Sequence, residues 1–144
     1  MFVVDTNILI YAVDKNCSEH YVCYDLIDRW RKDYLPWYVT WAILYEFLRV
    51  STHSRVFTKP LRLEQAWKFI QALLTSPGLK ILSEGPGHAE IANKTFKEIV
   101  GIGGNLLYNA RTAIIMREHG INRIYTRDTD FHRFPFLQVI DPLN

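Results

Sequence analysis

The sequence lacks the features that hold very small secreted proteins together or anchor proteins in membranes. Its only cysteines, Cys17 and Cys23, are too few for a disulfide framework and do not have the CxxC spacing of a zinc ribbon. No run approaches the roughly 18 apolar residues of a membrane span, and no basic segment with a long apolar stretch precedes Asp5. We therefore expect a cytoplasmic protein with reduced thiols, no secretory leader and no membrane attachment.

A strong excess of charge of one sign is also missing. The chain has 17 Lys and Arg against 15 Asp and Glu, a formal net charge of +2, which permits a nucleic-acid partner without requiring one. A length of 144 residues with 49% hydrophobic content is enough for one substantial core. Because no linker, internal repeat or low-complexity tract interrupts the chain, we expect residues 1–144 to form a single domain.

Short apolar runs alternate with helical patterns along the chain. Helix-start signals stand at Ser18 and Thr40, and Gly120 is a helix-stop signal. Strands alternating with helices predict an α/β sandwich around a mostly parallel sheet. The predicted strands cover residues 2–4, 37–39, 79–82, 123–126 and 137–140, and the main predicted helices cover 18–31, 41–48, 63–74, 88–99 and 106–119.

Acidic residues stand where such a sheet would place a binding site. Asp5 ends the first strand, Glu46 lies about two turns into the helix after the second strand, and Asp128 follows the fourth strand with Asp130 close behind. Ligands of open parallel sheets bind beyond the carboxyl ends of the strands. Two carboxylates about 4 Å apart repel each other by several kcal/mol at an effective dielectric near 20. A cation such as Mg²⁺ or Mn²⁺, which prefers oxygen ligands, would offset that cost.

Each acidic residue also has an ordinary structural explanation. Asp5 could serve only as a helix cap, Glu46 could lie on an exposed helix face, and Asp128 and Asp130 could be turn residues. Composition and spacing alone leave both explanations open.

Four segments of the chain, taken in order, resemble a known family. Residues 2–12, 41–50, 104–111 and 126–135 are similar to the four motif segments of PIN domains, and most similar to those of the VapC-type toxins of toxin–antitoxin modules. The resemblance implies a three-layer α/β/α sandwich and an endoribonuclease that uses Mg²⁺ or Mn²⁺ at a four-carboxylate site. It also implies a homodimer restrained by a VapB-like antitoxin, with loops of transfer or ribosomal RNA as substrates. Hydrolysis by water would leave 5′-phosphate and 3′-hydroxyl ends.

The resemblance also assigns roles to individual residues. Asp5 becomes the central metal ligand, Glu46 the second carboxylate that orients the attacking water, and Asp128 the fourth carboxylate. Asp130 becomes an outer helper of the metal site. The remaining motif positions, expected to hold the metal ligands by hydrogen bonds, are Thr6, Asn7 and Thr126.

The third acidic position of the family is occupied here by Asn109. An amide offers one neutral oxygen in place of two charged ones, so metal affinity should fall, particularly for a second ion. The change could be natural and tolerated, could mark an attenuated member that only binds RNA or antitoxin, or could be a deliberate substitution. Asn109 could also be a helix-start residue without a ligand role. A flavodoxin-like cofactor domain is disfavoured, because no glycine-rich phosphate loop follows the first strand.

Basic residues near the acidic segments are candidates for contacts with a partner. They could bind RNA phosphates or the carboxylates of an antitoxin tail, although a solvated basic surface is the simpler explanation for any one of them. These candidates are Arg49, Arg111, Arg127 and Arg133.

Overall fold

A five-stranded parallel sheet forms the centre of the computed structural model, which describes residues 1–144. The strands lie in the order β3-β2-β1-β4-β5, and every neighbouring pair is parallel. All five predicted strands are therefore present, with small shifts at their ends. Their bounds are β1 Val3–Val4, β2 Trp37–Thr40, β3 Leu79–Leu82, β4 Arg123–Tyr125 and β5 Gln138–Ile140.

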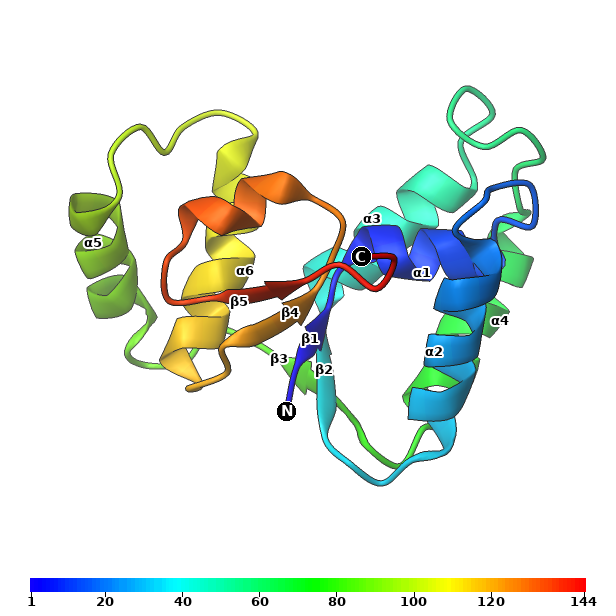
Figure 1. Ribbon diagram of the computed structural model, residues 1–144, viewed down its shortest axis with the longest axis horizontal. Helices are drawn as coiled ribbons and strands as arrows, with labels where there is room; N and C mark the ends of the chain where they lie inside the picture. The colour runs from blue at the N-terminus through cyan, green and yellow to red at the C-terminus, as the bar shows by residue number, and fades with distance from the viewer.

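Helices cover both faces of this sheet, which confirms the predicted three-layer α/β/α sandwich (Figure 1). One face carries α1 Thr6–Val13, α2 His20–Lys32, α3 Trp41–Ser51 and α4 Leu63–Leu74. The other face carries α5 His88–Glu98, α6 Leu106–Glu118 and the short 3₁₀ helix η1 Thr129–Arg133. No helix combines the length and the apolarity that crossing a membrane demands.

The strand order creates a switch point beside the central strand β1. The chain leaves β1 toward β2 and β3 on one side, then crosses through α5 and α6 to β4 on the other side. At such a point the loops after two adjacent strands diverge to opposite faces and leave a crevice between them. The backbone N–H of Asp5 donates to the Tyr125 carbonyl at 3.0 Å, so the residues that follow β1 and β4 begin their loops side by side.

Local signals in the sequence explain most of the helix ends. The Thr40 hydroxyl accepts from the Ile43 N–H at 3.1 Å and caps α3, as predicted. Gly120 has a φ of +68° directly after α6, a conformation that glycine adopts without steric cost. The predicted cap at Ser18 is wrong: α2 begins at His20, and its N-cap Glu19 makes no capping hydrogen bond. The Ser18 hydroxyl instead donates to the neighbouring Glu19 carboxylate at 3.2 Å.

Candidate active site

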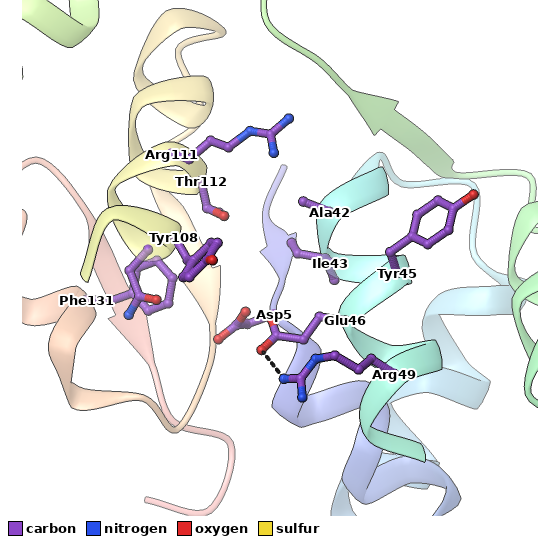
Figure 2. A pocket seen from close by; sticks show the side chains of 11 residues that line it. Asp5, Ala42, Ile43, Tyr45, Glu46, Arg49, Tyr108, Arg111, Thr112 and Phe131 are labelled. Atoms are coloured by element: carbon purple, nitrogen blue, oxygen red, sulfur yellow. Dashed lines mark ion pairs between the residues drawn. The ribbon is translucent and has the colours of Figure 1, made fainter. Parts of the chain in front are cut away.

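A cleft opens at the switch point, between α3 on one side and α6 on the other (Figure 2). It consists of a pocket of about 550 Å³ and an adjoining pocket of about 230 Å³ that share Asp5, Glu46 and Asn109. Asp128 lines the smaller pocket. Residues from four distant parts of the sequence therefore meet in one place: the three acidic positions Asp5, Glu46 and Asp128, and Asn109, which the family resemblance added. The larger pocket is lined by Asp5, Ala42, Ile43, Tyr45, Glu46, Arg49, Tyr108, Asn109, Arg111, Thr112 and Phe131.

Asp5 lies at the centre of the cleft and is also the N-cap of α1. Its Oδ1 accepts from the Thr6 backbone N–H at 2.8 Å. Its Oδ2 accepts from the Thr126 hydroxyl at 2.7 Å and from the Asn7 side-chain amide at 3.0 Å. Asp5 is therefore the helix cap that its position allowed and also lines the cleft, while its role as a metal ligand stays a prediction. The hydrogen bonds fix both carboxylate oxygens relative to the end of β4.

Thr126 and Asn7 connect the loop after β1 to the loop after β4. The fully buried Thr126 hydroxyl accepts from the Asn7 amide at 2.9 Å and from the Asp128 backbone N–H at 3.0 Å. The Asn7 carbonyl oxygen accepts from the Arg127 backbone N–H at 3.1 Å. Because a hydrogen bond inside protein is stiffened by its neighbours, this network holds Asp5 and Asp128 in a fixed relation.

Glu46 reaches the cleft from α3 and is its most exposed carboxylate. The Thr6 hydroxyl donates to Oε2 at 3.3 Å, and the Arg49 guanidinium lies 3.7 Å from Oε1 (Figure 2). The Glu46 side chain keeps 52% of its surface exposed. Figure 2 shows it pointing toward Asp5 across the floor of the cleft. A carboxylate held this loosely remains accessible to water and substrate.

Asn109 comes from α6 and binds Asp128 directly. Its Nδ2 donates to the Asp128 Oδ2 at 2.9 Å, while the Asp128 Oδ1 accepts from the Asp130 backbone N–H at 3.0 Å. Asn109 is the fourth residue of α6, whose N-cap is Asn105, so its interpretation as a helix-start residue is wrong. Asp128 is the N-cap of η1 and therefore has the turn role that its position allowed in addition to its place in the cleft. The Asp130 side chain is exposed and does not line the cleft.

Burial of Asp5 is the strongest electrostatic feature of the cleft. Loss of hydration raises the pKa of Asp5 from 3.8 to about 6. Hydrogen bonds from Thr126 and the Thr6 backbone lower the pKa in part, and the negative charges of Glu46 and Asp128 raise it again. A perturbed carboxylate in a cleft is typical of functional sites.

Comparison with known proteins gives the family. The family model "PIN domain" matches residues 2–137. The chain belongs to the PIN-domain family. It is similar to Ribonuclease VapC43 of Mycobacterium tuberculosis, with 32% identity over all of this chain and 97% of that relative. This similarity confirms the VapC-type resemblance of the four motif segments.

Solved structures agree with the architecture. VapBC2 from Rickettsia felis, bound to a DNA fragment from its promoter, matches with a TM-score of 0.65 and 18% identity over 96% of both chains. VapC20 of Mycobacterium tuberculosis, a sarcin-ricin loop cleaving toxin, matches with a TM-score of 0.64 and 18% identity over 92% of this chain and 93% of that one. At these identities the likeness shows the fold alone.

The oxygen-rich cleft of this PIN domain suits a hard divalent cation in its chemistry. Nowhere in the chain do three or more His, Cys, Asp or Glu side chains gather closely enough to hold a metal ion. Mg²⁺ nevertheless keeps several waters and needs only one or two carboxylates from the protein. Asp5 and Asp128 supply such carboxylates. The side-chain oxygen of Asn109, Oδ1, accepts no hydrogen bond within the protein and could therefore also bind the ion. The residues present therefore fit Mg²⁺ or Mn²⁺, and the metal site stays a prediction.

The four candidate arginines divide into two pairs. Arg49 and Arg111 are exposed and line the larger pocket, where Arg111 also donates to Glu84 at 2.7 Å. Arg127 already forms two ion pairs within the protein, with Glu19 at 3.0 Å and with Asp141 at 3.2 Å. Arg133 donates to the Val100 carbonyl at 2.9 Å. Only the first pair has its charge directed at the cleft.

Several side chains that line the cleft were not identified as site residues from the sequence, and Thr112, Phe131 and Tyr45 are examples. Thr112 lies one helical turn after Asn109 on α6, and its spacing was a signal that could have found it. Phe131 is the buried residue of η1, and Tyr45 precedes Glu46 on α3 at the rim. Neither has a sequence signal that separates it from other aromatic residues of the chain. They add aromatic surface on the two sides of the cleft, Phe131 on the side of α6 and Tyr45 on α3.

Proposed function

We propose that this PIN domain, formed by residues 1–144, is an endoribonuclease toxin of the VapC type. It hydrolyses RNA phosphodiester bonds and leaves 5′-phosphate and 3′-hydroxyl ends. The observation that carries the proposal is the convergence of Asp5, Glu46, Asn109 and Asp128 on one cleft at the switch point of the sheet. VapC43 and VapC33, both similar to this chain along nearly their whole length, are named ribonucleases, which favours catalysis over a silent binding module.

The residues of the cleft divide the work of hydrolysis. Asp5 and Asp128, fixed by Thr126 and Asn7, would hold one Mg²⁺ or Mn²⁺ together with the Asn109 carbonyl oxygen. When bound, the ion neutralises charge on the phosphodiester and favours deprotonation of water. Glu46, which is half-exposed, accepts the proton of the water that attacks phosphorus in line as the 3′-oxygen leaves.

Positive charge and aromatic surface beside the cleft suit an RNA loop. Arg49 and Arg111 stand on opposite walls and can each bind a phosphate of the backbone. The Tyr108 ring is 75% exposed at the rim, where an unstacked base of a loop can stack on it. We include transfer or ribosomal RNA loops as the substrate class, with support from the activity named for VapC20.

The proposed biological setting follows from the solved relatives of the same fold. VapBC2 of Rickettsia felis is a complex of two proteins bound to promoter DNA. We propose that this chain likewise binds a VapB-like antitoxin, which covers the cleft. We also propose that it forms a homodimer and is located in the cytoplasm. Co-purification with the product of an adjacent small gene, followed by loss of RNA cleavage in the complex, would support this setting.

Substitution of the cleft carboxylates tests the proposed activity. We expect Asp5→Asn and Glu46→Gln each to lower kcat for cleavage of a loop-containing RNA by about 10²-fold or more, because each removes a charged oxygen that contacts the reacting groups. The matched control is Glu90→Gln, at an exposed position of α5 outside the cleft, which should cleave like the unaltered protein.

The ends of the products identify the mechanism. A chelator should abolish cleavage and added Mn²⁺ should restore it, with 5′-phosphate ends on the downstream fragments. Cleavage that persists in the chelator and leaves 2′,3′-cyclic phosphate ends would show that water is not the nucleophile, and the proposed hydrolysis would then be wrong.

A further inference from the structure

Asn109 is the only side chain of α6 that donates a hydrogen bond to a cleft carboxylate. Its Nδ2 binds the Asp128 Oδ2 at 2.9 Å, across 19 positions of sequence. An ionised carboxylate only accepts hydrogen bonds, so the nitrogen of the amide has to be the atom that faces Asp128. The bond therefore connects α6 to the loop after β4.

Every carboxylate of the cleft is already satisfied by donors of the protein itself. Asp5 accepts from Thr6, Asn7 and Thr126, Asp128 accepts from Asn109 and Asp130, and Glu46 accepts from Thr6 beside Arg49. Asn109 occupies the third acidic position of the family pattern, and an aspartate there would have nearly the same shape as the asparagine. An aspartate there would bring two negative oxygens to about hydrogen-bonding distance, which is unfavourable without a cation between them.

We propose that Asn109 is a positioning residue: its side-chain amide stabilises the negative charge of Asp128 where a cation would otherwise be needed. The cleft therefore stays ordered without metal and binds a single divalent ion. The part of this proposal that concerns the ion rests on the proposed nuclease function. The part that concerns order in the metal-free protein depends only on the Asn109–Asp128 bond and needs neither RNA nor catalysis. Asn109 thus sets both the stability of the empty cleft and the number of ions it accepts.

Thermal unfolding in a chelator tests the positioning role. We expect Asn109→Asp to lower the Tm by about 4–8 °C, because it replaces a charge-assisted hydrogen bond with a like-charge contact. Asn109→Ala, which removes the bond without adding charge, should lower the Tm by a smaller amount. The matched control is Asn105→Asp at the exposed N-cap of the same helix, where a negative charge faces the helix N-terminus and the Tm should not fall.

Calorimetric titration with Mn²⁺ alone tests the number of ions. The unaltered protein and Asn105→Asp should bind one Mn²⁺ ion, whereas Asn109→Asp should bind two and regain in saturating Mn²⁺ the Tm lost in the chelator. If Asn109→Asp fails to fold in the chelator, refolding on addition of Mn²⁺ supports the proposal, and the Asn109→Ala measurement still tests the bond.

Three results would overturn the inference. They are an unchanged Tm of both Asn109 variants in the chelator, two ions bound by the unaltered protein, and the same stoichiometry in the unaltered protein and Asn109→Asp. Failure of the nuclease proposal is distinguishable from these, because it would appear as normal Mn²⁺ binding and normal stability without any RNA cleavage.

Discussion

Asp5 has two structural roles with opposite effects on the charge of its carboxyl group. As the N-cap of α1 it accepts a hydrogen bond from Thr6, which favours the charged form. As the enclosed carboxylate of the cleft it loses hydration, which favours the neutral form and raises its pKa to about 6. Burial outweighs the hydrogen bonds, so the folded metal-free protein carries an unfavourable charge at neutral pH. Such local conflicts are common at functional sites.

The raised pKa of Asp5 predicts how the stability of the metal-free protein depends on pH. Between pH 4 and 6 the folded state binds more protons at Asp5 than the unfolded state, so the free energy of unfolding should fall as the pH rises through this window and level off above it. A pKa raised from 3.8 to about 6 corresponds to roughly 3 kcal/mol, and partial exposure of Asp5 to solvent reduces this to about 1–2 kcal/mol. Urea unfolding in a chelator at several pH values measures this decline.

Asp5→Asn should remove that part of the pH dependence, since an amide does not titrate between pH 4 and 6, although it keeps only one of the two oxygens that accept hydrogen bonds from Thr6, Asn7 and Thr126. Asp25→Asn, at an exposed position of α2, controls for the loss of one negative charge. If the free energy of unfolding falls with pH by the same amount in both variants, titratable groups other than Asp5 cause the effect.

The sequence predicted the individual site residues unevenly, for physical reasons. Asp5 and Asp128 could be found because strand ends are local features and parallel strands end at the same edge of a sheet. The bond between Asn109 and Asp128 could not be found, because it depends on how α6 is rotated against the sheet. That rotation is set by packing of its almost entirely buried segment from Ala110 to Met116, which has little amphipathic pattern to read.

At the scale of helices and strands, hydrophobic periodicity and capping signals were sufficient to locate most elements. Thr40 marks the start of α3 and Gly120 marks the end of α6 through local interactions and backbone conformation. Such helix ends can therefore be predicted from the sequence alone. The order of the strands is different, because β4 pairs with β1 across more than a hundred residues. No local pattern specifies that pairing. The alternation of strands and helices predicted the α/β class, the PIN resemblance added the three layers, and the order of the strands came only from the coordinates.

The turn between α4 and β3 contains a glycine that another loop approaches closely. A Cβ at Gly78 would collide with the backbone carbonyl of Leu35 and lie 3.0 Å from the carbonyl of Asp33, in the loop between α2 and β2. We expect Gly78→Ala to lower the free energy of unfolding by about 2–4 kcal/mol, because backbone on both sides would have to move. Denaturant unfolding of the purified variant measures the loss.

Gly103→Ala is the matched control for this turn. A Cβ at Gly103 would meet nothing within 4 Å, and this residue does not have a positive φ. The control should be neutral or gain up to about 1 kcal/mol from reduced freedom of the unfolded chain. Equal stability of the two variants would mean that the loop at Leu35 yields easily, contrary to the close approach seen here.

At the scale of the whole molecule, one continuous core joins the two helical layers through the sheet. The 26 buried apolar residues of this core include Leu73 of α4 on one face, Ile114 of α6 on the other, and Val3, Val4 and Ile124 between them. The cleft forms at the carboxyl edge of the sheet, between α3 of one layer and α6 of the other. Since each wall of the cleft belongs to a different layer, its geometry depends on the two layers remaining packed together.

The distribution of tryptophan makes that dependence measurable. All four tryptophans, Trp30, Trp37, Trp41 and Trp67, lie in α2, β2, α3 and α4, and none lies in the layer that contains α6. Ile114→Ala should cost about 2–5 kcal/mol by leaving a cavity on the α6 side. If the chain unfolds as one unit, tryptophan fluorescence and far-UV circular dichroism should show the same lowered urea midpoint with an unchanged m value. Leu107→Ala, at an exposed position of the same helix, should barely move either midpoint. A fluorescence transition that ignored Ile114→Ala while the circular dichroism transition shifted would show that the two layers unfold separately.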